Sequence, residues 1–321
     1  MSEKDMSENE STRTAGSAAA SGTDESVALS IRDLNLTIDD HHILKDVSLD
    51  VPSGKVMGLA GESGSGKTMT GMTVLGLQPE GAEVTGEIDY HGENLLALND
   101  RQMASYRGHH IAMVFQDPTA SLHPMIRIGV QLTDHMRHHL GLSKQEARER
   151  AIELLKLVQV PDPEGTLKRY PHQFSGGQLQ RIAIAVAIAC KPDLIIADEP
   201  TTALDVTVQA GILQLLRHLC DTTGLTIILI THDLGVMSAL ADEIAVMRGG
   251  QIVERGSRYD VIRNPQHPYT KALIDSLPKQ MMERRDQAAQ AGQQAQSGPA
   301  AQAAPGEAEQ PSEPQEGGQH D

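Results

Sequence analysis

The chain has 321 residues and a formal net charge of -16 at pH 7. This length allows one large domain or two smaller ones, because a single hydrophobic core stops growing at about 250 to 300 residues. The acidic balance, without any cluster of Lys or Arg, argues against nucleic acid as a partner. The two cysteines, Cys190 and Cys220, stand in no CxxC spacing, which argues against a disulfide framework or a zinc site.

Both ends of the chain have the composition of disordered tails. Residues 1–26 hold six acids and two bases, and residues 286–321 hold six acids, no base, and no Leu, Ile, Val or aromatic residue. Such segments bury too little apolar surface to offset the entropy of ordering. We therefore expect one folded domain over 27–285, between two disordered tails that carry most of the net negative charge.

The first part of this domain reads as β-structure followed by a strand, a loop and a helix. Apolar and polar residues alternate over 27–38 and again over 47–51, which is typical of half-buried strands. The continuous apolar run Val56–Ala60 indicates a fully buried strand, and helical spacing follows from Lys67 to about Leu77. An antiparallel β-subdomain is therefore expected ahead of a strand-loop-helix unit.

Helical character then dominates the middle of the chain. Residues 125–160 carry helical spacing, and Ser143 with Glu146 forms a predicted capping box. We expect a helical subdomain over about 119–175. No apolar run reaches the roughly 20 residues of a membrane-spanning helix, so any membrane association is expected to be peripheral.

Strands and helices alternate again after residue 176. Apolar runs at 194–197 and 225–230 are of the buried, parallel-strand kind, and 206–219 supplies a helix between them. A hairpin turned at a Gly-Gly pair is expected over 243–254. The predicted fold class is therefore α/β.

Residues 61–68 match the phosphate-binding pattern GxxxxGK[ST], between a predicted strand and a predicted helix as the motif requires. Its members are Gly61, Glu62, Ser63, Gly64, Ser65, Gly66, Lys67 and Thr68. The glycines let backbone N–H groups close around phosphate oxygens. Lys67 supplies charge for the β- and γ-phosphates, and the Thr68 hydroxyl is a hard ligand suited to Mg²⁺. The loop predicts nucleotide binding but does not separate a transporter ATPase from a kinase, a GTPase or a helicase.

Two carboxylates, Asp198 and Glu199, follow the apolar run 194–197. Ligands of open α/β sheets bind at the carboxyl edge of the strands, so both acids are expected beside the phosphate loop. Asp198 is placed to hold Mg²⁺, directly or through water, and Glu199 to act as general base on an attacking water.

A short glycine-containing motif decides the family. Phe174 is followed by Ser175, Gly176, Gly177 and Gln178 ahead of a long helical run, and the segment resembles the signature of the ABC family, usually LSGGQ. In that family the signature serves the γ-phosphate held by the opposite subunit. The resemblance implies an ABC-type P-loop domain, ATP as the nucleotide, and a dimer with two ATP molecules between its subunits.

Other family positions appear in the family's order. Gln116 matches the Q-loop, whose glutamine senses metal and water, and Asp205 matches the D-loop, which touches the facing subunit. His232 matches the switch histidine that contacts the γ-phosphate. ABC ATPases commonly stack adenine on an aromatic residue of the amino-terminal β-region, and Ile38 stands at that position here.

The segment 264–278 resembles the carboxyl-terminal motif of the oligopeptide/dipeptide/nickel importer ATPases, and 170–175 looks like the first of the two paralogues that such importers usually pair. This resemblance implies a peripheral ATPase on the cytoplasmic face of the cell membrane that drives uptake of peptides or nickel. The implied partners are a second, paralogous ABC ATPase, two transmembrane permease subunits and, indirectly, an extracytoplasmic solute-binding protein. Another solute, or a soluble ABC ATPase outside transport, stays open as an alternative.

Overall fold

The computed structural model describes residues 26–202 and 204–276. The predicted tails, 1–26 and 286–321, lie outside this part of the chain apart from Ser26. The last two residues of the predicted carboxyl-terminal motif also lie outside it.

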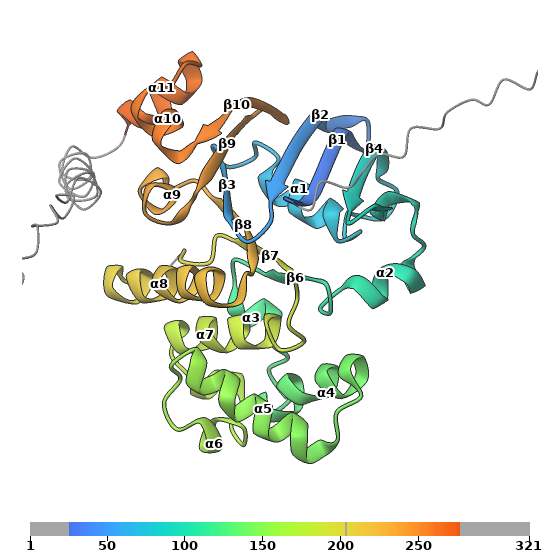
Figure 1. Ribbon diagram of the computed structural model, residues 1–321, viewed down its shortest axis with the longest axis vertical. Coiled ribbons are helices and arrows are strands. Elements are labelled where there is room, and N and C mark those ends of the chain that lie inside the picture. The colour runs from blue at the N-terminus through green and yellow to red at the C-terminus, as the bar shows by residue number, and fades with distance from the viewer. Residues whose placement is uncertain (1–25, 203, 277–321) are drawn as a thin grey trace, which may run out of the picture. The chain divides into compact units, whose positions relative to one another are not determined.

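A four-stranded antiparallel sheet begins the domain, in the order β2-β1-β4-β5 (Figure 1). Its strands are β1 Val27–Ile38, β2 His41–Pro52, β4 Glu83–Tyr90 and β5 Glu93–Asn94. The turn between β1 and β2 is made by Asp39 and Asp40, with positive φ angles of 44° and 62°. Aspartate tolerates this left-handed region better than most residues, so the pair makes a tight hairpin. The predicted amino-terminal strands are confirmed, and β2 is longer than predicted.

A six-stranded central sheet follows, in the order β10-β9-β3-β8-β7-β6. Its strands are β3 Val56–Ala60, β6 Ile111–Val114, β7 Leu194–Asp198, β8 Thr226–Thr231, β9 Glu243–Arg248 and β10 Gln251–Ser257. All neighbours run parallel except β9 and β10, which form the predicted hairpin. The predicted α/β class is confirmed, and the carboxyl ends of β3, β7 and β8 share one edge.

Helices connect and cover the strands (Figure 1). The longer ones are α1 Lys67–Val74, α2 Asp100–Tyr106, α4 Ile128–Leu140, α5 Lys144–Leu157, α7 Gly176–Ala187, α8 Val206–Thr223, α9 Leu234–Leu240, α10 Arg258–Arg263 and α11 Pro268–Asp275. Single turns are η1 Leu95–Ala97, α3 Pro118–Ser121, α6 Pro163–Thr166 and η2 Pro171–Gln173. Within 26–202 and 204–276, each helix is too short or too polar to span a lipid bilayer.

The helical region between β6 and β7 is built from short, capped helices. Helix α4 is capped at its carboxyl end by Gly141, whose φ of 65° suits glycine, so the helical stretch predicted over 125–160 is divided in two. At the start of α5 the Ser143 side chain accepts the Glu146 N–H, and the Glu146 carboxylate accepts the Ser143 N–H. The predicted capping box is confirmed.

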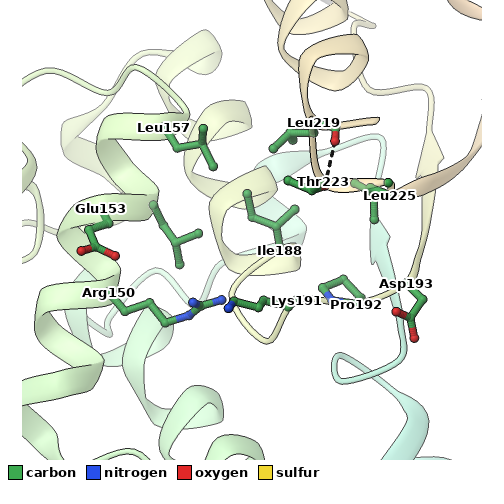
Figure 2. A pocket seen from close by; sticks show the side chains of 12 residues that line it. Arg150, Glu153, Leu157, Ile188, Lys191, Pro192, Asp193, Leu219, Thr223 and Leu225 are labelled. Carbon is green, nitrogen blue, oxygen red and sulfur yellow. Dashed lines mark hydrogen bonds between the residues drawn. The ribbon is translucent and has the colours of Figure 1, made fainter. Parts of the chain in front are cut away.

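A cavity of about 660 Å³ lies where α5, the turn before β7 and the end of α8 meet (Figure 2). Leu157, Ile188 and Leu225 line it with apolar surface. Near its edge the Arg150 guanidinium donates to the carbonyl of Ala189 at 2.9 Å and so ties α5 to the end of α7. The Arg150 side chain therefore joins two helices of this region beside an open space.

One apolar core joins the antiparallel sheet to the central sheet. Leu36 and Leu44 of the first sheet belong to the same buried cluster as Ile196, Ile230 and Met247 of the second, and none of the five is exposed to solvent. Burying side chains of this size contributes about 1.5 to 3 kcal/mol each. The core places the β3–α1 loop between the two sheets.

The stability of the fold should depend on glycine at position 86 in β4, because the backbone of β1 passes very close to it. Its φ is 110°, and an added Cβ would lie 2.6 to 2.8 Å from backbone atoms of Arg32, Asp33 and Leu34. We expect Gly86→Ala to lower the free energy of unfolding, measured in urea, by more than the about 1 to 3 kcal/mol of backbone strain alone. Gly81→Ala is the control, because Gly81 also has a positive φ but an added Cβ would meet nothing within 4 Å. Equal losses would contradict the crowding argument.

Candidate active site

The predicted phosphate loop connects β3 to α1 at the carboxyl edge of the central sheet. Gly61, Gly64 and Gly66 have positive φ angles of 148°, 80° and 105°. Gly66 is the N-cap of α1 and provides no side-chain cap, so the first turn of α1 keeps its partial positive charge for an anion.

Gly61 and Gly66 are crowded by neighbouring atoms, whereas Gly64 faces open space that a phosphate could occupy. A Cβ added at Gly61 would lie 2.2 Å from the carbonyl oxygen of Met247, and one added at Gly66 would lie 2.8 Å from Leu44. A Cβ added at Gly64 would meet nothing within 4 Å. The loop is therefore packed against β2 and β9 on one side and open at Gly64.

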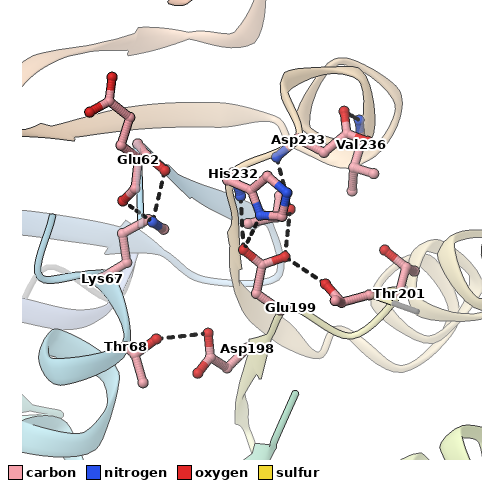
Figure 3. A network of polar contacts seen from close by, with 12 residues as sticks. Glu62, Lys67, Thr68, Asp198, Glu199, Thr201, His232, Asp233 and Val236 are labelled. Carbon is pink, nitrogen blue, oxygen red and sulfur yellow. Dashed lines mark hydrogen bonds and ion pairs between the residues drawn. The ribbon is translucent and has the colours of Figure 1, made fainter. Parts of the chain in front are cut away.

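Lys67 is folded back onto the loop (Figure 3). Its Nζ donates to the carbonyl oxygens of Gly61 and Glu62, both at 2.8 Å, and the residue is only 6% exposed. Burial lowers the pKa of Lys67, and the nearby carboxylates of Glu199 and Asp198 oppose this effect. The ammonium group is thus held by carbonyls that a phosphate would replace.

Thr68 and Asp198 meet across the gap between α1 and β7 (Figure 3). The Thr68 hydroxyl donates to Asp198 Oδ1 at 3.1 Å, and Asp198 is 4% exposed. Burial, reinforced by the neighbouring Glu199, raises the pKa of Asp198. Two hard oxygen ligands therefore lie together beside the phosphate loop, which fits a Mg²⁺ ion.

Glu199 has an unusual backbone and a fixed side chain. Its φ of 47° lies in the left-handed region, which is uncommon outside glycine. Oε1 accepts the His232 backbone N–H at 3.0 Å and lies 2.6 Å from His232 Nδ1. Oε2 accepts the hydroxyls of Thr202 and Thr231 at 2.9 and 3.2 Å. The carboxylate is therefore oriented by three residues, with its side chain only 13% exposed.

Thr202 and Thr231 were not among the predicted site residues. Each lies within three positions of a predicted one, because Thr231 precedes His232 and Thr202 follows Glu199 by three. A threonine beside such an acid gives no distinctive pattern, since hydroxyl residues are common at strand ends and in turns. Their hydrogen bonds to one carboxylate become visible only in the fold.

The predicted signature motif lies at the start of α7, on another element than the phosphate loop (Figure 1). Ser175 and Gln178 cap each other, since each side chain accepts the other's backbone N–H. A Cβ added at Gly177 would lie 2.5 Å from the Val208 side chain. Asp205 caps α8 by accepting the N–H groups of residues 207 and 208. The starts of α7 and α8 are therefore packed together.

Two predicted positions stand apart from this cluster. Gln116 is exposed in the loop that follows β6. Ile38 is half-buried at the end of β1, pairs with His41 across the hairpin, and packs against the apolar core. The structure thus brings together Lys67, Thr68, Asp198, Glu199 and His232, as Figure 3 shows.

Two family models match the chain. The model described as ABC transporter matches residues 44–202. This range includes the phosphate loop, the signature motif, Asp198 and Glu199. The model described as oligopeptide/dipeptide transporter, C-terminal region, matches residues 253–306.

Curated relatives match over most of their length. The chain is 44% identical to a probable D,D-dipeptide transport ATP-binding protein of Escherichia coli, over 80% of each chain. It is 45% identical to a dipeptide transport ATP-binding protein of Bacillus subtilis, over 78% of this chain and 77% of the relative. The chain belongs to the ABC transporter ATP-binding proteins of the oligopeptide/dipeptide family. The resemblance drawn from its motifs is confirmed.

Solved structures agree with this family assignment. A dimeric ATP-binding cassette in a post-hydrolysis state, bound to ADP and phosphate, matches with a TM-score of 0.64 and 28% identity, over 72% of this chain and 98% of that one. The cbiO1 protein of Clostridium perfringens, part of an ABC transporter complex, matches with a TM-score of 0.65 and 25% identity, over 81% and 99%. The chain is an ABC ATPase, and the predicted enzyme class is confirmed.

Asp198→Asn should stabilise the nucleotide-free protein at pH 7. A carboxyl whose pKa is raised on folding contributes stability below its ordinary pKa, here 3.8, and this stability is lost as the pH rises through the folded pKa. Asparagine keeps an oxygen for Thr68 but carries no buried charge. We expect a higher urea midpoint at pH 7, and a gain that shrinks as the pH approaches 3.8.

The control is Asp221→Asn, because the Arg217 guanidinium lowers the pKa of Asp221. Removing the Asp221 carboxylate should leave the urea midpoint at pH 7 unchanged or lower it. A lower midpoint for Asp198→Asn would contradict the prediction.

Proposed function

We propose that this chain is the ATP-hydrolysing subunit of an importer of dipeptides or oligopeptides, bound peripherally at the cytoplasmic face of the membrane. The match of residues 253–306 to the oligopeptide/dipeptide transporter C-terminal region carries this proposal. The relatives named above are peptide transport proteins, which favours peptides over nickel as the solute.

The phosphate loop and β7 hold the nucleotide with its metal. Backbone N–H groups of residues 63–68 surround the phosphates, and Lys67 leaves the carbonyls of Gly61 and Glu62 to pair with the β- and γ-phosphates. Thr68 and Asp198 would supply oxygen ligands for Mg²⁺, and Gln116, which stands apart from this pair, would have to move to join them. When bound there, Mg²⁺ would neutralise charge on the phosphate oxygens.

Glu199 is the general base of hydrolysis. Its carboxylate accepts a proton as a water oxygen attacks the γ-phosphorus, and the bond from that phosphorus to the ADP oxygen breaks. His232, Thr202 and Thr231 hold the carboxylate in one orientation. His232 remains 62% exposed, so its ring can also face the γ-phosphate.

A second ATPase subunit completes each site. Ser175, Gly176, Gly177 and Gln178 of one subunit face the γ-phosphate bound by the other, and Asp205 contacts the facing chain. The dimeric cassette with ADP and phosphate supports this arrangement. The second subunit is a paralogue of this chain.

The adenine base rests on Ile38, which offers it an aliphatic surface in place of an aromatic ring.

Two permease subunits bind beside the helical region. A groove of about 300 Å³ near Gln116 is lined by Phe115, Leu122 and His139, among other residues. Its mixed apolar and imidazole lining suits a short amphipathic helix of a membrane subunit. The extracytoplasmic solute-binding protein acts on this chain only through the permease.

The base assignment is tested by Glu199→Gln. Glutamine keeps the shape but cannot accept the proton, so hydrolysis should slow by roughly 10² to 10⁴ while ATP binding persists. With Mg²⁺, ATP and its partner, the variant should accumulate as an ATP-bound dimer in size-exclusion chromatography. Lys67→Ala, the contrasting variant, should weaken nucleotide binding itself. Near-normal turnover of Glu199→Gln would show that Glu199 is not the base.

The transport assignment is tested by purifying the protein from detergent-solubilised membranes of the organism that naturally produces it. Mass spectrometry should identify two permeases and a paralogous ATPase at stoichiometric amounts. After reconstitution with the solute-binding protein, a dipeptide or oligopeptide should accelerate ATP hydrolysis, whereas free amino acids and Ni²⁺ should not. Stimulation by Ni²⁺ alone would contradict the peptide assignment.

A further inference from the structure

The carboxyl-terminal segment reaches the phosphate loop through one side chain. Tyr269 stands in the first turn of α11, and its hydroxyl accepts the backbone N–H of Glu62 at 3.1 Å. The two residues are 207 positions apart in sequence. Tyr269 is only 8% exposed, so this hydrogen bond is largely shielded from water.

Several contacts fix the position of the Tyr269 ring. The Arg248 guanidinium at the end of β9 lies 4.8 Å from the ring centroid. The His267 side chain accepts the Tyr269 N–H at 3.2 Å and thereby caps α11. The ring is therefore held from the β9 side and from its own helix.

Glu254 of β10 anchors the segment just before α11. Its carboxylate accepts the N–H groups of Gln266 and His267 at 2.7 and 3.0 Å. Burial raises the pKa of Glu254, but these hydrogen bonds outweigh it and hold the pKa below its ordinary value. The start of α11 is thus fixed to the same hairpin that packs against the phosphate loop.

The backbone of Glu62 is held on both sides of its Cα atom. Its N–H donates to Tyr269, and its carbonyl accepts Lys67 Nζ at 2.8 Å and the Ser65 N–H at 3.2 Å. When Lys67 turns to a phosphate, the bond from Nζ to this carbonyl is lost. The Tyr269 bond does not involve Lys67 and can persist.

We propose that Tyr269 is a positioning residue for nucleotide binding, whose hydroxyl holds the Glu62 backbone in place through its N–H group once Lys67 has moved to the phosphates. This inference rests on the proposed nucleotide-binding role of residues 61–68. It assigns a function to the carboxyl-terminal segment of this chain: α11 sets the shape of the phosphate loop. A purely structural role would instead make Tyr269 matter for stability and leave nucleotide affinity unchanged.

Tyr269→Phe isolates the hydroxyl, because the ring and its contact with Arg248 are kept. The control is Tyr259→Phe on α10, where the tyrosine is 56% exposed and also has an arginine, Arg263, 5.0 Å from its ring centroid. Affinity of each full-length protein for Mg²⁺-ATP is measured by titration calorimetry. KM and kcat are measured with the partner ATPase, and the unfolding midpoint is measured without nucleotide.

A neutral hydrogen bond corresponds to roughly a 2- to 10-fold change in an equilibrium constant. We expect Tyr269→Phe to raise Kd and KM for ATP by that factor, with kcat unchanged, and Tyr259→Phe to match the wild type. Equal ATP affinities of Tyr269→Phe and the wild type would overturn this inference and leave the proposed function standing. A fall in kcat and unfolding midpoint without a change in KM would also overturn it. Failure of the wild type and of Tyr259→Phe to bind ATP would overturn the proposed function itself.

Discussion

Close backbone packing between the phosphate loop and the β9–β10 hairpin is the constraint on which the site depends. Glycine is required at Gly61, where a Cβ would lie 2.2 Å from the Met247 carbonyl, and at Gly250, where it would lie 2.3 Å from the Ile43 carbonyl. The Gly250 N–H donates to the Ser65 carbonyl at 3.0 Å. The loop therefore takes its shape from a hairpin far along the chain, and a shift of that hairpin would displace the start of α1.

This packing leaves the charged groups of Lys67 and Asp198 buried. Burial lowers the pKa of Lys67 and raises that of Asp198, so each charged form is less stable there than in solution. Their mutual attraction offsets only part of this cost. A nucleotide would bring negative charge to Lys67, and its metal would bring positive charge to Asp198. The site is thus arranged for charges that the chain does not itself contain.

The strands and motifs of the core are predictable because they leave local signals. Parallel strands covered on both faces need continuous apolar runs, and Val56–Ala60 and residues 194–197 show them. β4 and β6 were not predicted, since Gly86 interrupts the first and the second has only four residues. Both short length and a central glycine weaken the alternation that identifies a strand.

In the site, too, some features leave a local signal in the sequence and others do not. Local sequence indicates the phosphate loop and the two acids at the end of β7, whereas His232 is indicated only by its resemblance to the switch histidine of the ABC family. The hydrogen bonds that orient Glu199, and the contact of Tyr269 with Glu62, join residues distant in sequence and have no local pattern. The positive φ of Glu199 is equally hidden, because it is imposed by the turn after β7 and by pairing of the Glu199 N–H with the Ile230 carbonyl.

The signature motif shows why one chain is an incomplete site under the proposed mechanism. Its serine and glutamine already cap each other at the start of α7, so this end is preformed before any phosphate arrives. Gly177 lies so close to the Val208 side chain of α8 that a rotation of α7 would press on that helix, whose first turn Asp205 caps. A movement of the helical region, where the permease is proposed to bind, would therefore carry the signature and the D-loop together. Under the proposed mechanism, both would then approach or leave the partner's phosphate loop together.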